Sequence, residues 1–335
     1  MKKEANASLC EALRDISQGS FLIECPQYPQ TAAEEFPPFA RQSQIRTDGK
    51  GCLIIYSVCP GITVSLHYYL GERFVFHHQA FPTILEINYC RLGRTGWNMK
   101  NGTAVYLGAG DLAIHSMDCC SDSVMMLPLG YYEGISVSAD LTVLQQNCPD
   151  ILREANFDAA ALAARLCMDH KPFALPASSQ IEAVFGPLCG LPEKLRLPYY
   201  KLKVQELLLY LSQLNLSDEK ELTLYFSRQT EQIRQIHDLM ILHPERRYTI
   251  DELSRQFLIN TSTLKEVFKA VYGLPIATYM KEYRIHQAMK LLRDTDDSIA
   301  SIASRMGYES QGKFSRAFRD VAQLLPSEYR RLSRS

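Results

Sequence analysis

The sequence predicts an α+β protein with a β-rich front, a helical middle and an all-α C-terminal module. Short β-branched and aromatic runs between turn signals fill residues 52–138, and helical periodicity begins near residue 139. About a hundred residues at the end repeat one two-helix pattern. We therefore expect an N-terminal region at 1–138, a helical subdomain and linker at 139–228, and a third module at 229–335.

The strand-rich region contains the runs LIIYSV, ITVSLHYYL, FVFHHQ, TILEINY, DLAIHSM and SVMMLPL. They are separated by the turn sequences PG, LGE, RLGRTG, NGT and GAGD. Strands at this spacing predict a small barrel or a sandwich. Before them, residues 1–50 show only weak periodicity and turn-rich pieces such as ECPQYPQ.

The helical middle includes the segment YYKLKVQELLLYLSQL at 199–214. Its apolar stripe is formed by Tyr200, Val204, Leu207, Leu208 and Leu211. Leu202 and Leu209 lie off this stripe, so a second side of the helix is apolar as well. Burial within the chain and a subunit interface in a homodimer both explain that second side. The polar run LNLSDEKEL then predicts a linker.

The C-terminal module contains two helix-turn-helix patterns about fifty residues apart. The first opens with a capping box, Thr249 to Glu252, and the second turns at Gly307 and Tyr308. The second helix of each pattern has the same i, i+3, i+4, i+7 stripe, made of Leu264, Val267, Phe268 and Val271 in one and Phe314, Ala317, Phe318 and Val321 in the other.

The polar residues opposite these stripes suit the edges of base pairs. The first helix presents Ser262, Lys265, Glu266 and Lys269, and the second presents Ser310, Gln311, Gly312, Ser315, Arg316 and Arg319. Gln suits adenine and Arg suits guanine in the major groove, while Ser310 can cap its helix and leave a positive end for a phosphate. A solvated charged face would explain one such helix, whereas two copies favour contact with double-stranded DNA.

A single helix from Pro275 to Arg293 connects the two patterns. At 1.5 Å per residue it spans roughly 28 Å, which suits two major-groove segments about one DNA turn, roughly 34 Å, apart. The distribution of charge agrees with contact to DNA, because residues 231–335 carry 17 basic and 13 acidic groups within a chain of net charge −1. A mildly basic module on an acidic body points to a polyanionic partner.

The N-terminal sequence has no apolar signal region, and no later window approaches 18 uninterrupted apolar residues. We expect a cytoplasmic protein with no membrane partner. All ten cysteines lie between Cys10 and Cys189, and in this compartment they are expected to be reduced thiols.

Residues 231–335 resemble the DNA-binding domain of AraC/XylS-type transcription regulators. The resemblance rests on IASIASRMGYES, FSRAF, LLPSEYR and the connector YMKEYRIHQAMKLL. It implies promoter binding through the residues named above, a homodimer, contact with RNA polymerase and, most commonly, activation. The chain departs from the family at Leu258, where many members have glycine, and at Gly312, which has no side chain to read a base.

The front of the chain resembles the barrel-plus-helices sensor domains fused to such modules. The runs LEINYCRLGRTGW, NGTAVYLGAGDLAIH and LPLGYYEGISV carry this likeness, which is nearest to the PchR-like branch and to cupin-like barrels. It implies a cavity for a small-molecule effector. Arg91, Arg94 and Trp97 suit an aromatic or acidic ligand, and His77 and His115 are further candidates; a packed indole and exposed cations explain the first three equally well.

We expect no cofactor, no metal and no catalytic residues. Adjacent strand residues point to opposite faces, so His77 and His78 cannot easily share a metal, and Cys119-Cys120 lacks the C-x-x-C spacing. The other cysteines also lack the close pairs of the zinc-holding, methyl-accepting regulators. Two alternatives stay open: a cupin-type metal-dependent enzyme or metal sensor fused to the DNA-binding module, and an empty barrel controlled by a partner protein.

Overall fold

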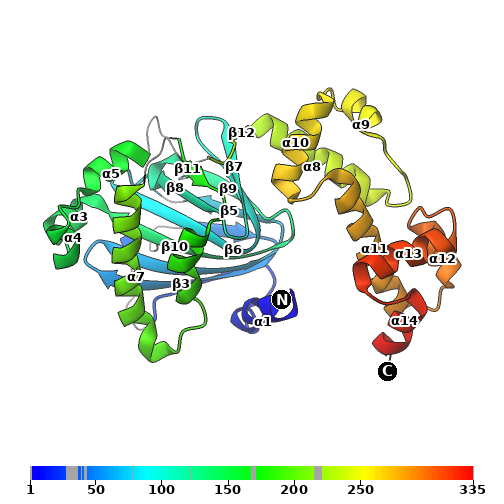
Figure 1. Cartoon of the computed structure of the whole chain (residues 1–335), viewed down its shortest axis with the longest axis horizontal. Helices are drawn as coiled ribbons and strands as arrows, with labels where there is room; N and C mark the ends of the chain where they lie inside the picture. Colours follow the sequence, from blue (N-terminus) through cyan, green and yellow to red (C-terminus); the bar gives the residue numbers. More distant parts are fainter. Residues whose placement is uncertain are drawn as a thin grey trace. The chain divides into compact units, whose positions relative to one another are not determined.

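The computed structural model describes residues 2–27, 37–38, 40, 44–77, 79–120, 122–166, 171–214 and 221–334. The chain divides into two compact units, Met1–Ser227 and Arg228–Ser335 (Figure 1). The strand-rich and helical segments lie together in the first unit, and the C-terminal helices form the second. The predicted α+β fold is confirmed.

The first unit is built on a sheet that closes almost completely into a barrel. Its main path of hydrogen-bonded neighbours is β1-β3-β4-β10-β6-β9-β5-β2, and its two end strands lie beside each other. The bounds are β1 (Ser20–Glu24), β2 (Gln44–Thr47), β3 (Lys50–Cys59), β4 (Ile62–Leu70), β5 (Arg73–His77), β6 (Ile84–Asn98), β7 (Thr103–Gly108), β8 (Leu112–Ser116), β9 (Asp122–Met126), β10 (Tyr131–Asp140), β11 (Phe173–Leu175) and β12 (Tyr225–Phe226).

The long strand β6 belongs to both halves of the barrel. Residues 84–93 pair with β10, residues 85–89 also pair with β8, and residues 94–98 pair with β7. The register with β10 shifts between Glu133 and Gly134, which leaves Arg91 as the extra residue of a β-bulge. A bulge bends its strand, so the two halves of β6 can pair with different neighbours and curve around an interior.

The two faces of the sheet differ in polarity. On β4, Ile62, Val64 and Leu66 join the apolar cluster that contains the helices. The alternate positions Ser65, His67 and Tyr69 line the barrel interior instead. Because successive strand side chains point to opposite faces, one strand supplies both an apolar outer layer and a polar inner one.

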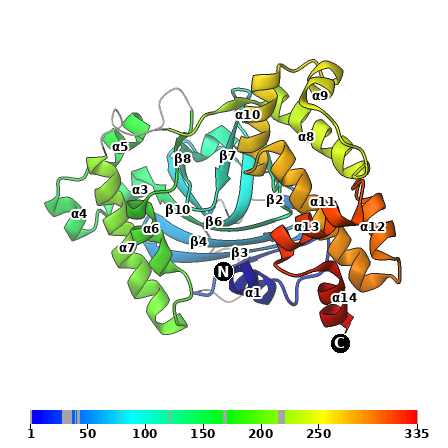
Figure 2. The ribbon, with the colours of Figure 1, turned by 45° about the vertical axis from the view of Figure 1, so that its right-hand side comes forward.

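Helices of the first unit cover the apolar outer face (Figure 2). They are α3 (Leu141–Gln146), α4 (Asp150–Glu154), α5 (Ala159–Leu166), α6 (Ser179–Phe185) and α7 (Glu193–Gln213), with 3₁₀ turns at Met117–Cys120 and Gly186–Leu188. The stripe predicted on α7 is confirmed, since all five of its side chains are buried. Leu202 is 61% exposed, whereas Leu209 is partly buried against the same cluster.

The barrel also draws on segments outside 52–138. β1 and β2 come before that region, and the short strands β11 and β12 come after it and pair with β8 and β7. A helix, α1 (Lys2–Ala12), precedes β1. Its Leu9 and the residue after the helix, Leu13, are buried in a small cluster with Cys52. Strands of two to five residues are too short to show a clear alternation, so sequence periodicity did not reveal them.

The second unit consists of helices: α8 (Ser227–Leu242), α9 (Ile250–Gln256), α10 (Thr261–Tyr272), α11 (Ile276–Asp294), α12 (Ile299–Arg305), α13 (Gln311–Ala322) and α14 (Pro326–Arg334). The pairs α9–α10 and α12–α13 are the two predicted helix-turn-helix patterns. The long helix α11 runs between them (Figures 1 and 2). No helix in the described ranges is long and apolar enough to cross a membrane.

The helix ends in this unit follow the predicted signals. Thr249 and Glu252 form the capping box of α9, and the hydroxyl of Ser310 accepts a hydrogen bond from the backbone N–H of Lys313 at 3.3 Å. Gly307 ends α12 with φ +73°, and Leu258 takes the equivalent left-handed conformation with φ +50°. The first turn therefore uses left-handed backbone without glycine.

The segment 243–249 between α8 and α9, which we name the bracing loop, ties the two helix pairs together. Arg284 of α11 donates to the carbonyl oxygens of Pro244 at 2.6 Å and Arg246 at 2.9 Å. Arg247 donates to the carbonyl of Gly307 at 3.3 Å. The bracing loop thus contacts both the connector helix and the turn of the second pair, which fixes their geometry within this unit.

Candidate DNA-binding surface and barrel cavity

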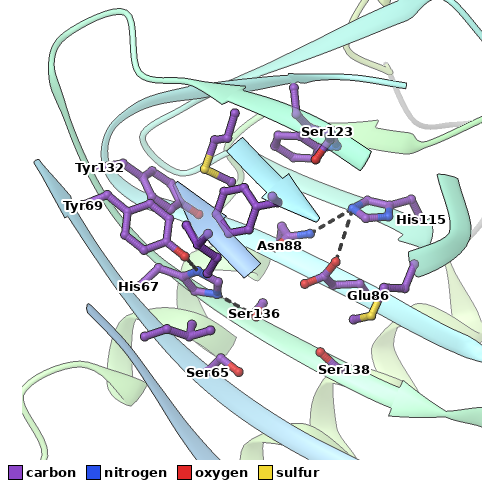
Figure 3. Close-up of a pocket in the computed structure, with 16 residues that line it drawn as sticks. Ser65, His67, Tyr69, Glu86, Asn88, His115, Ser123, Tyr132, Ser136 and Ser138 are labelled. Atoms are coloured by element: carbon purple, nitrogen blue, oxygen red, sulfur yellow. Dashed lines mark hydrogen bonds and ion pairs between the residues drawn. The ribbon is translucent and has the colours of Figure 1, made fainter. Parts of the chain in front are cut away.

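The barrel encloses a cavity of about 100 Å³ (Figure 3). Its lining mixes polar and aromatic side chains, namely Ile45, Leu53, Ser65, His67, Tyr69, Phe76, Glu86, Asn88, Trp97, His115, Met117, Ser123, Met125, Tyr132, Ser136 and Ser138. These residues come mainly from β4, β6 and β10, whose polar faces meet inside the barrel. A pocket of this composition has many hydrogen-bonding groups that can hold a ligand in one orientation.

His67 lies at the centre of one polar group in the cavity. Its Nδ1 is 2.7 Å from the hydroxyl of Tyr69, and its Nε2 is 2.8 Å from the hydroxyl of Ser136. Burial lowers the pKa of His67 to about 3, so the imidazole is neutral. One ring nitrogen therefore donates and the other accepts, and the two hydroxyls are oriented by the same ring.

A second polar group contains His115, Asn88 and Glu86. The Nδ1 of His115 lies 3.1 Å from the carbonyl oxygen of Ser116, which places a proton on Nδ1. Its Nε2 is 3.1 Å from the amide nitrogen of Asn88 and 3.7 Å from a carboxylate oxygen of Glu86 (Figure 3). The Glu86 carboxylate thus lies at the cavity beside a ring nitrogen that accepts a hydrogen bond from Asn88.

Aromatic rings form another part of the cavity wall. Tyr69 and Tyr132 lie 5.6 Å apart between centroids, and the ring of Trp97 lies 5.7 Å from that of His115. Trp97 is buried, with only 5% of the residue exposed, and its indole N–H has no acceptor among the described residues. A buried donor without a partner is unfavourable, so this N–H is available to an acceptor on a bound molecule.

The exposed side of α10 carries the predicted polar residues. Ser262, Lys265, Glu266 and Lys269 are all exposed, while the stripe of α10 is buried. Asn260 caps this helix, and its side-chain oxygen accepts from the backbone N–H groups of Ser262 at 2.9 Å and Thr263 at 3.3 Å. The two helix faces are therefore separated as predicted.

The exposed side of α13 is the more cationic of the two. Ser310, Gln311, Gly312, Arg316 and Arg319 are exposed, and Ser315 is half-buried. In this exposed set, neither arginine forms a salt bridge with a described residue. Neighbouring charges are paired, since Lys313 pairs with Glu309 and Lys281 of α11 lies 2.8 Å from Asp320. The two arginines are left as the cations that an outside anion can meet.

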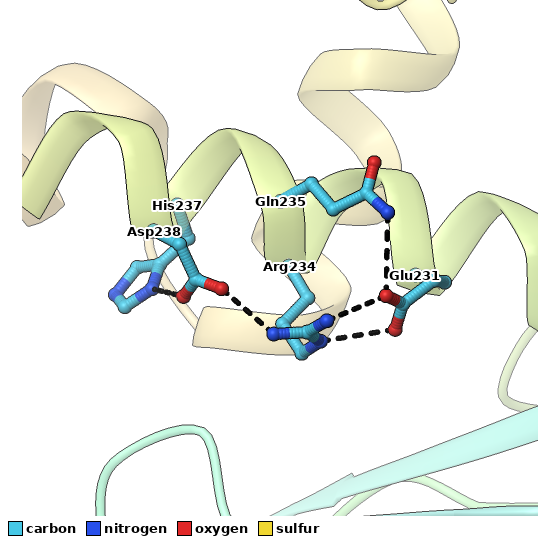
Figure 4. A network of polar contacts seen from close by, with 5 residues as sticks. All are labelled: Glu231, Arg234, Gln235, His237 and Asp238. Carbon is cyan, nitrogen blue, oxygen red and sulfur yellow. Dashed lines mark hydrogen bonds and ion pairs between the residues drawn. The ribbon is translucent and has the colours of Figure 1, made fainter.

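The first helix pair rests on a polar and aromatic arrangement around α8. Arg234 bridges Glu231 at 2.6 Å and Asp238 at 2.7 Å on the surface of α8 (Figure 4). His237 stacks on Tyr272 of α10 at 4.3 Å, and its Nε2 is 2.8 Å from the hydroxyl of Tyr279 of α11. These contacts hold α8, α10 and α11 together beneath the exposed face of α10.

A family model described as a helix-turn-helix domain matches residues 253–332. A putative AraC-like transcription regulator of Streptomyces lividans is 36% identical over 95 residues, which are 28% of this chain and 31% of that protein. The second unit is an AraC-family helix-turn-helix domain. The transcriptional activator RhaR of Mannheimia succiniciproducens is 34% identical over 83 residues, covering 25% of this chain and 30% of its own length.

The AraC-family match lies at the C-terminal end of the chain. The regulator ExsA of Pseudomonas aeruginosa is 30% identical over 131 residues, covering 38% of this chain and 46% of ExsA. The chain thus spans less than half the length of each of these relatives. The resemblance of the barrel to the PchR-like branch stays a prediction.

Of the five effector-binding residues predicted in the barrel, two line the cavity and three lie elsewhere. Trp97 and His115 line the cavity, whereas Arg91, Arg94 and His77 do not belong to its described lining. Arg91, the bulge residue, lies 2.5 Å from Glu133, whose carboxylate also accepts from Ser8. Arg94 lies beside Asp111 at the GAGD turn, and His77 alternates with Phe76, so it points away from the interior.

Several further cavity residues form rows along the strands, which residue types taken one at a time do not reveal. His67, Tyr69, Glu86, Asn88, Tyr132 and Ser136 face the interior. The signal was present in ITVSLHYYL and GISVSAD, where polar residues alternate with apolar ones on strands that are otherwise buried. Such alternation in a closed barrel indicates a polar interior.

The described residues offer no group of three or more His, Cys, Asp or Glu that could hold a metal ion. His78 and Ser121 lie outside them, and the side chain of Cys120 is not described. Burial raises the pKa of Cys25 and of Cys119 to about 11 and that of Cys52 to about 12. These thiols therefore stay protonated near neutral pH and are poor nucleophiles.

Proposed function

We propose that this chain is a cytoplasmic transcription regulator that binds promoter DNA through α10 and α13 and responds to a small molecule in the barrel. The observation that carries the DNA part is the pair of capped, amphipathic helices in one AraC-family domain. Each is the second helix of its pair and presents exposed polar residues. Lys265 and Glu266 on α10, with Gln311 and Arg316 on α13, are the proposed base-reading side chains.

The effector part rests on the cavity. A barrel without a ligand would be filled most stably by apolar side chains, whereas this one holds serines, histidines, a carboxylate and an indole N–H without an acceptor. These groups suit a bound molecule that completes their hydrogen bonds. A ligand that prefers one arrangement of the two units then changes the affinity of the chain for its promoter.

A homodimer is part of the proposal. Leu195, Tyr199 and Leu202 are exposed at i, i+4 and i+7 on α7, on the side away from its buried stripe. Such a row suits a second copy of the chain. Leu202→Glu is expected to shift the sedimentation coefficient to that of a monomer, and an unchanged value would remove α7 from the interface. Activation extends the proposal by analogy with the relative named as an activator. Contact with RNA polymerase is added only from the resemblance to AraC/XylS-type regulators.

The DNA part is tested with the full chain and a labelled fragment of its own promoter. The double variant Arg316→Ala/Arg319→Ala should lose about tenfold or more in affinity, measured by fluorescence anisotropy. Lys194→Ala is the control, because it removes an exposed cation from α7 in the first unit. Equal affinity of the double variant and the control would contradict the proposed role of α13.

A further inference from the structure

We propose that the cavity ligand is a small organic cation, whose protonated amine meets Glu86 and whose ring lies against the aromatic wall. This inference rests on the proposed function of the cavity as an effector site and names the class of effector. It begins from the charges inside the barrel. Glu86 is the one carboxylate in the described lining, and no lysine or arginine is found there.

The two histidines of the lining direct their hydrogen bonds to groups other than Glu86. His67 is neutral and uses both ring nitrogens on Tyr69 and Ser136. His115 has its Nδ1 at the Ser116 carbonyl, and its Nε2 faces the amide nitrogen of Asn88. The nearest cation on the same strand, Arg91, is paired with Glu133 on the other face of the sheet.

The Glu86 carboxylate is turned toward the interior. Burial raises the pKa of Tyr69 and of Tyr132, and the charge of Glu86 raises both further across the cavity. No described residue donates a hydrogen bond to this carboxylate, and its approach to His115 is 3.7 Å, which is too long for one. A largely buried carboxylate with no donor is stabilised by an incoming ammonium group.

The aromatic wall adds a second preference for a cation. Tyr69, Phe76, Trp97 and Tyr132 line the same cavity, and the faces of such rings attract an ammonium group within about 6 Å. The indole N–H of Trp97 needs an acceptor, so the ligand should also carry a hydroxyl or carbonyl oxygen. A cavity of about 100 Å³ limits the body of the ligand to the order of one ring.

A carboxylate ligand is disfavoured by the same geometry. It would meet Glu86 as a like charge in a partly desolvated site, without an arginine or lysine from the described lining to offset it. A neutral alcohol could form hydrogen bonds with the hydroxyl groups of the lining, but its binding would gain nothing from the charge of Glu86. The charge of the ligand therefore separates the three classes.

The test uses the full chain and three probes that differ in one substituent: 4-hydroxybenzylamine, 4-hydroxybenzyl alcohol and 4-hydroxybenzoate. Trp97 is the single tryptophan of the chain, so its fluorescence reports directly on the cavity. The amine should change this fluorescence and raise the melting temperature. It should bind about ten- to a hundredfold more tightly than the alcohol, and the benzoate should bind more weakly still.

In the Glu86→Gln variant, the amine and the alcohol should bind with about equal affinity, so that the advantage of the amine is lost. Glu72→Gln, the same change at an exposed position outside the lining, should leave that advantage intact. The probe series on the unmodified chain remains decisive if Glu86→Gln folds poorly.

Three results would overturn the inference. Equal binding of amine and alcohol would leave the cavity as an effector site but remove the charge preference. Tighter binding of the benzoate would reverse the sign of that preference. No response to any probe would exclude an amine as the ligand of the cavity. A loss of promoter binding in the α13 double variant would still support the DNA part of the proposed function.

Discussion

The two helix-turn-helix pairs of the second unit follow one plan but differ at the turn between their helices. Gly307 makes the second turn with φ +73°, and Leu258 makes the first with φ +50°. A Cβ at position 307 would overlap the carbonyl oxygen of Glu245 in the bracing loop and come within 2.9 Å of its carbonyl carbon. Leu258 is 90% exposed and meets no such obstacle.

This difference separates two reasons for glycine in a turn. At both positions the left-handed backbone favours glycine, by roughly 1–2 kcal/mol over other residues. Only at Gly307 does another backbone segment also approach where a side chain would begin. The second turn is therefore part of a packed junction with the bracing loop, and the first is a free surface turn that tolerates leucine with local strain.

Gly307→Ala should have the largest effect of any substitution at these two turns. The added methyl group forces the bracing loop away and retains the unfavourable φ, so the free energy of unfolding should fall by about 2–4 kcal/mol. Thermal unfolding of the full chain, followed by helical circular dichroism, measures the loss. A change below about 1 kcal/mol would show that the bracing loop yields without strain.

Leu258→Gly is the matched change at the other turn, and it should act in the opposite direction. It removes the left-handed strain without opening a cavity, because the leucine side chain is exposed. We expect stability to rise by up to about 1 kcal/mol, reduced by the greater freedom of glycine in the unfolded chain. A destabilisation larger than this would mean that Leu258 makes contacts in solution.

The exposed faces of α10 and α13 should differ in what they read. Arg316 can form two parallel hydrogen bonds to guanine, whereas Lys265 is a point charge on a flexible stem. Arg316→Ala should cost about 1–3 kcal/mol of binding free energy and relax specificity at one base pair. Lys265→Ala should weaken binding to all sequences more evenly and lower the salt dependence.

Anisotropy titrations against promoter fragments with single base-pair changes, each at two salt concentrations, distinguish these two outcomes. Equal losses on every fragment for Arg316→Ala would assign α13 to the phosphate backbone. A loss confined to one base pair for Lys265→Ala would instead make α10 the reading helix.

The helix caps provide a smaller contrast. Asn260 accepts from two backbone N–H groups of α10, whereas Ser310 accepts from one of α13. Asn260→Ala should therefore lower stability by about 1–2 kcal/mol and Ser310→Ala by about 0.5–1 kcal/mol. Melting temperatures of the two variants, compared in one buffer, test the order. The reverse order would indicate that Asn260 is compensated by solvent.

The second unit could be predicted almost entirely from the sequence because its signals are local. Caps, a glycine turn and an i, i+3, i+4, i+7 stripe act within a dozen residues, so Thr249, Ser310 and Phe314 could be assigned from their neighbours alone. Leu258 departs from the glycine that many family members have at this turn, but the sequence does not choose between left-handed backbone and another kind of turn there. That choice is visible only in the fold.

The barrel cavity depends on contacts between distant segments, and its residues were harder to predict. His67 faces Ser136 across 69 positions, and Asn88 faces His115 across 27. Trp97 and His115 were found by residue type. Arg91 was not distinguished from them, because the bulge that pairs it with Glu133 is set by the register of β6 against β10. Register is a property of paired strands, and a single strand does not show it.

The smallest predicted effect concerns pH and again separates the two helix pairs. Burial lowers the pKa of His237 below its usual value, although Asp238 opposes this shift. Below pH 6.5 the unfolded chain therefore binds a proton that the folded chain does not bind, and stability falls as the pH drops through this range. In the cluster beneath the second pair, no histidine contributes to the described core.

His237→Gln tests this contribution. The variant loses the stacking on Tyr272 and should melt lower at pH 7.5, but its melting temperature should fall less than that of the unmodified chain between pH 7.5 and pH 5.5. His286→Gln, at an exposed position of α11, is the control and should leave the pH dependence unchanged. Parallel curves for all three proteins would mean that the pKa of His237 is the same in the folded and the unfolded chain, with Asp238 offsetting the effect of burial.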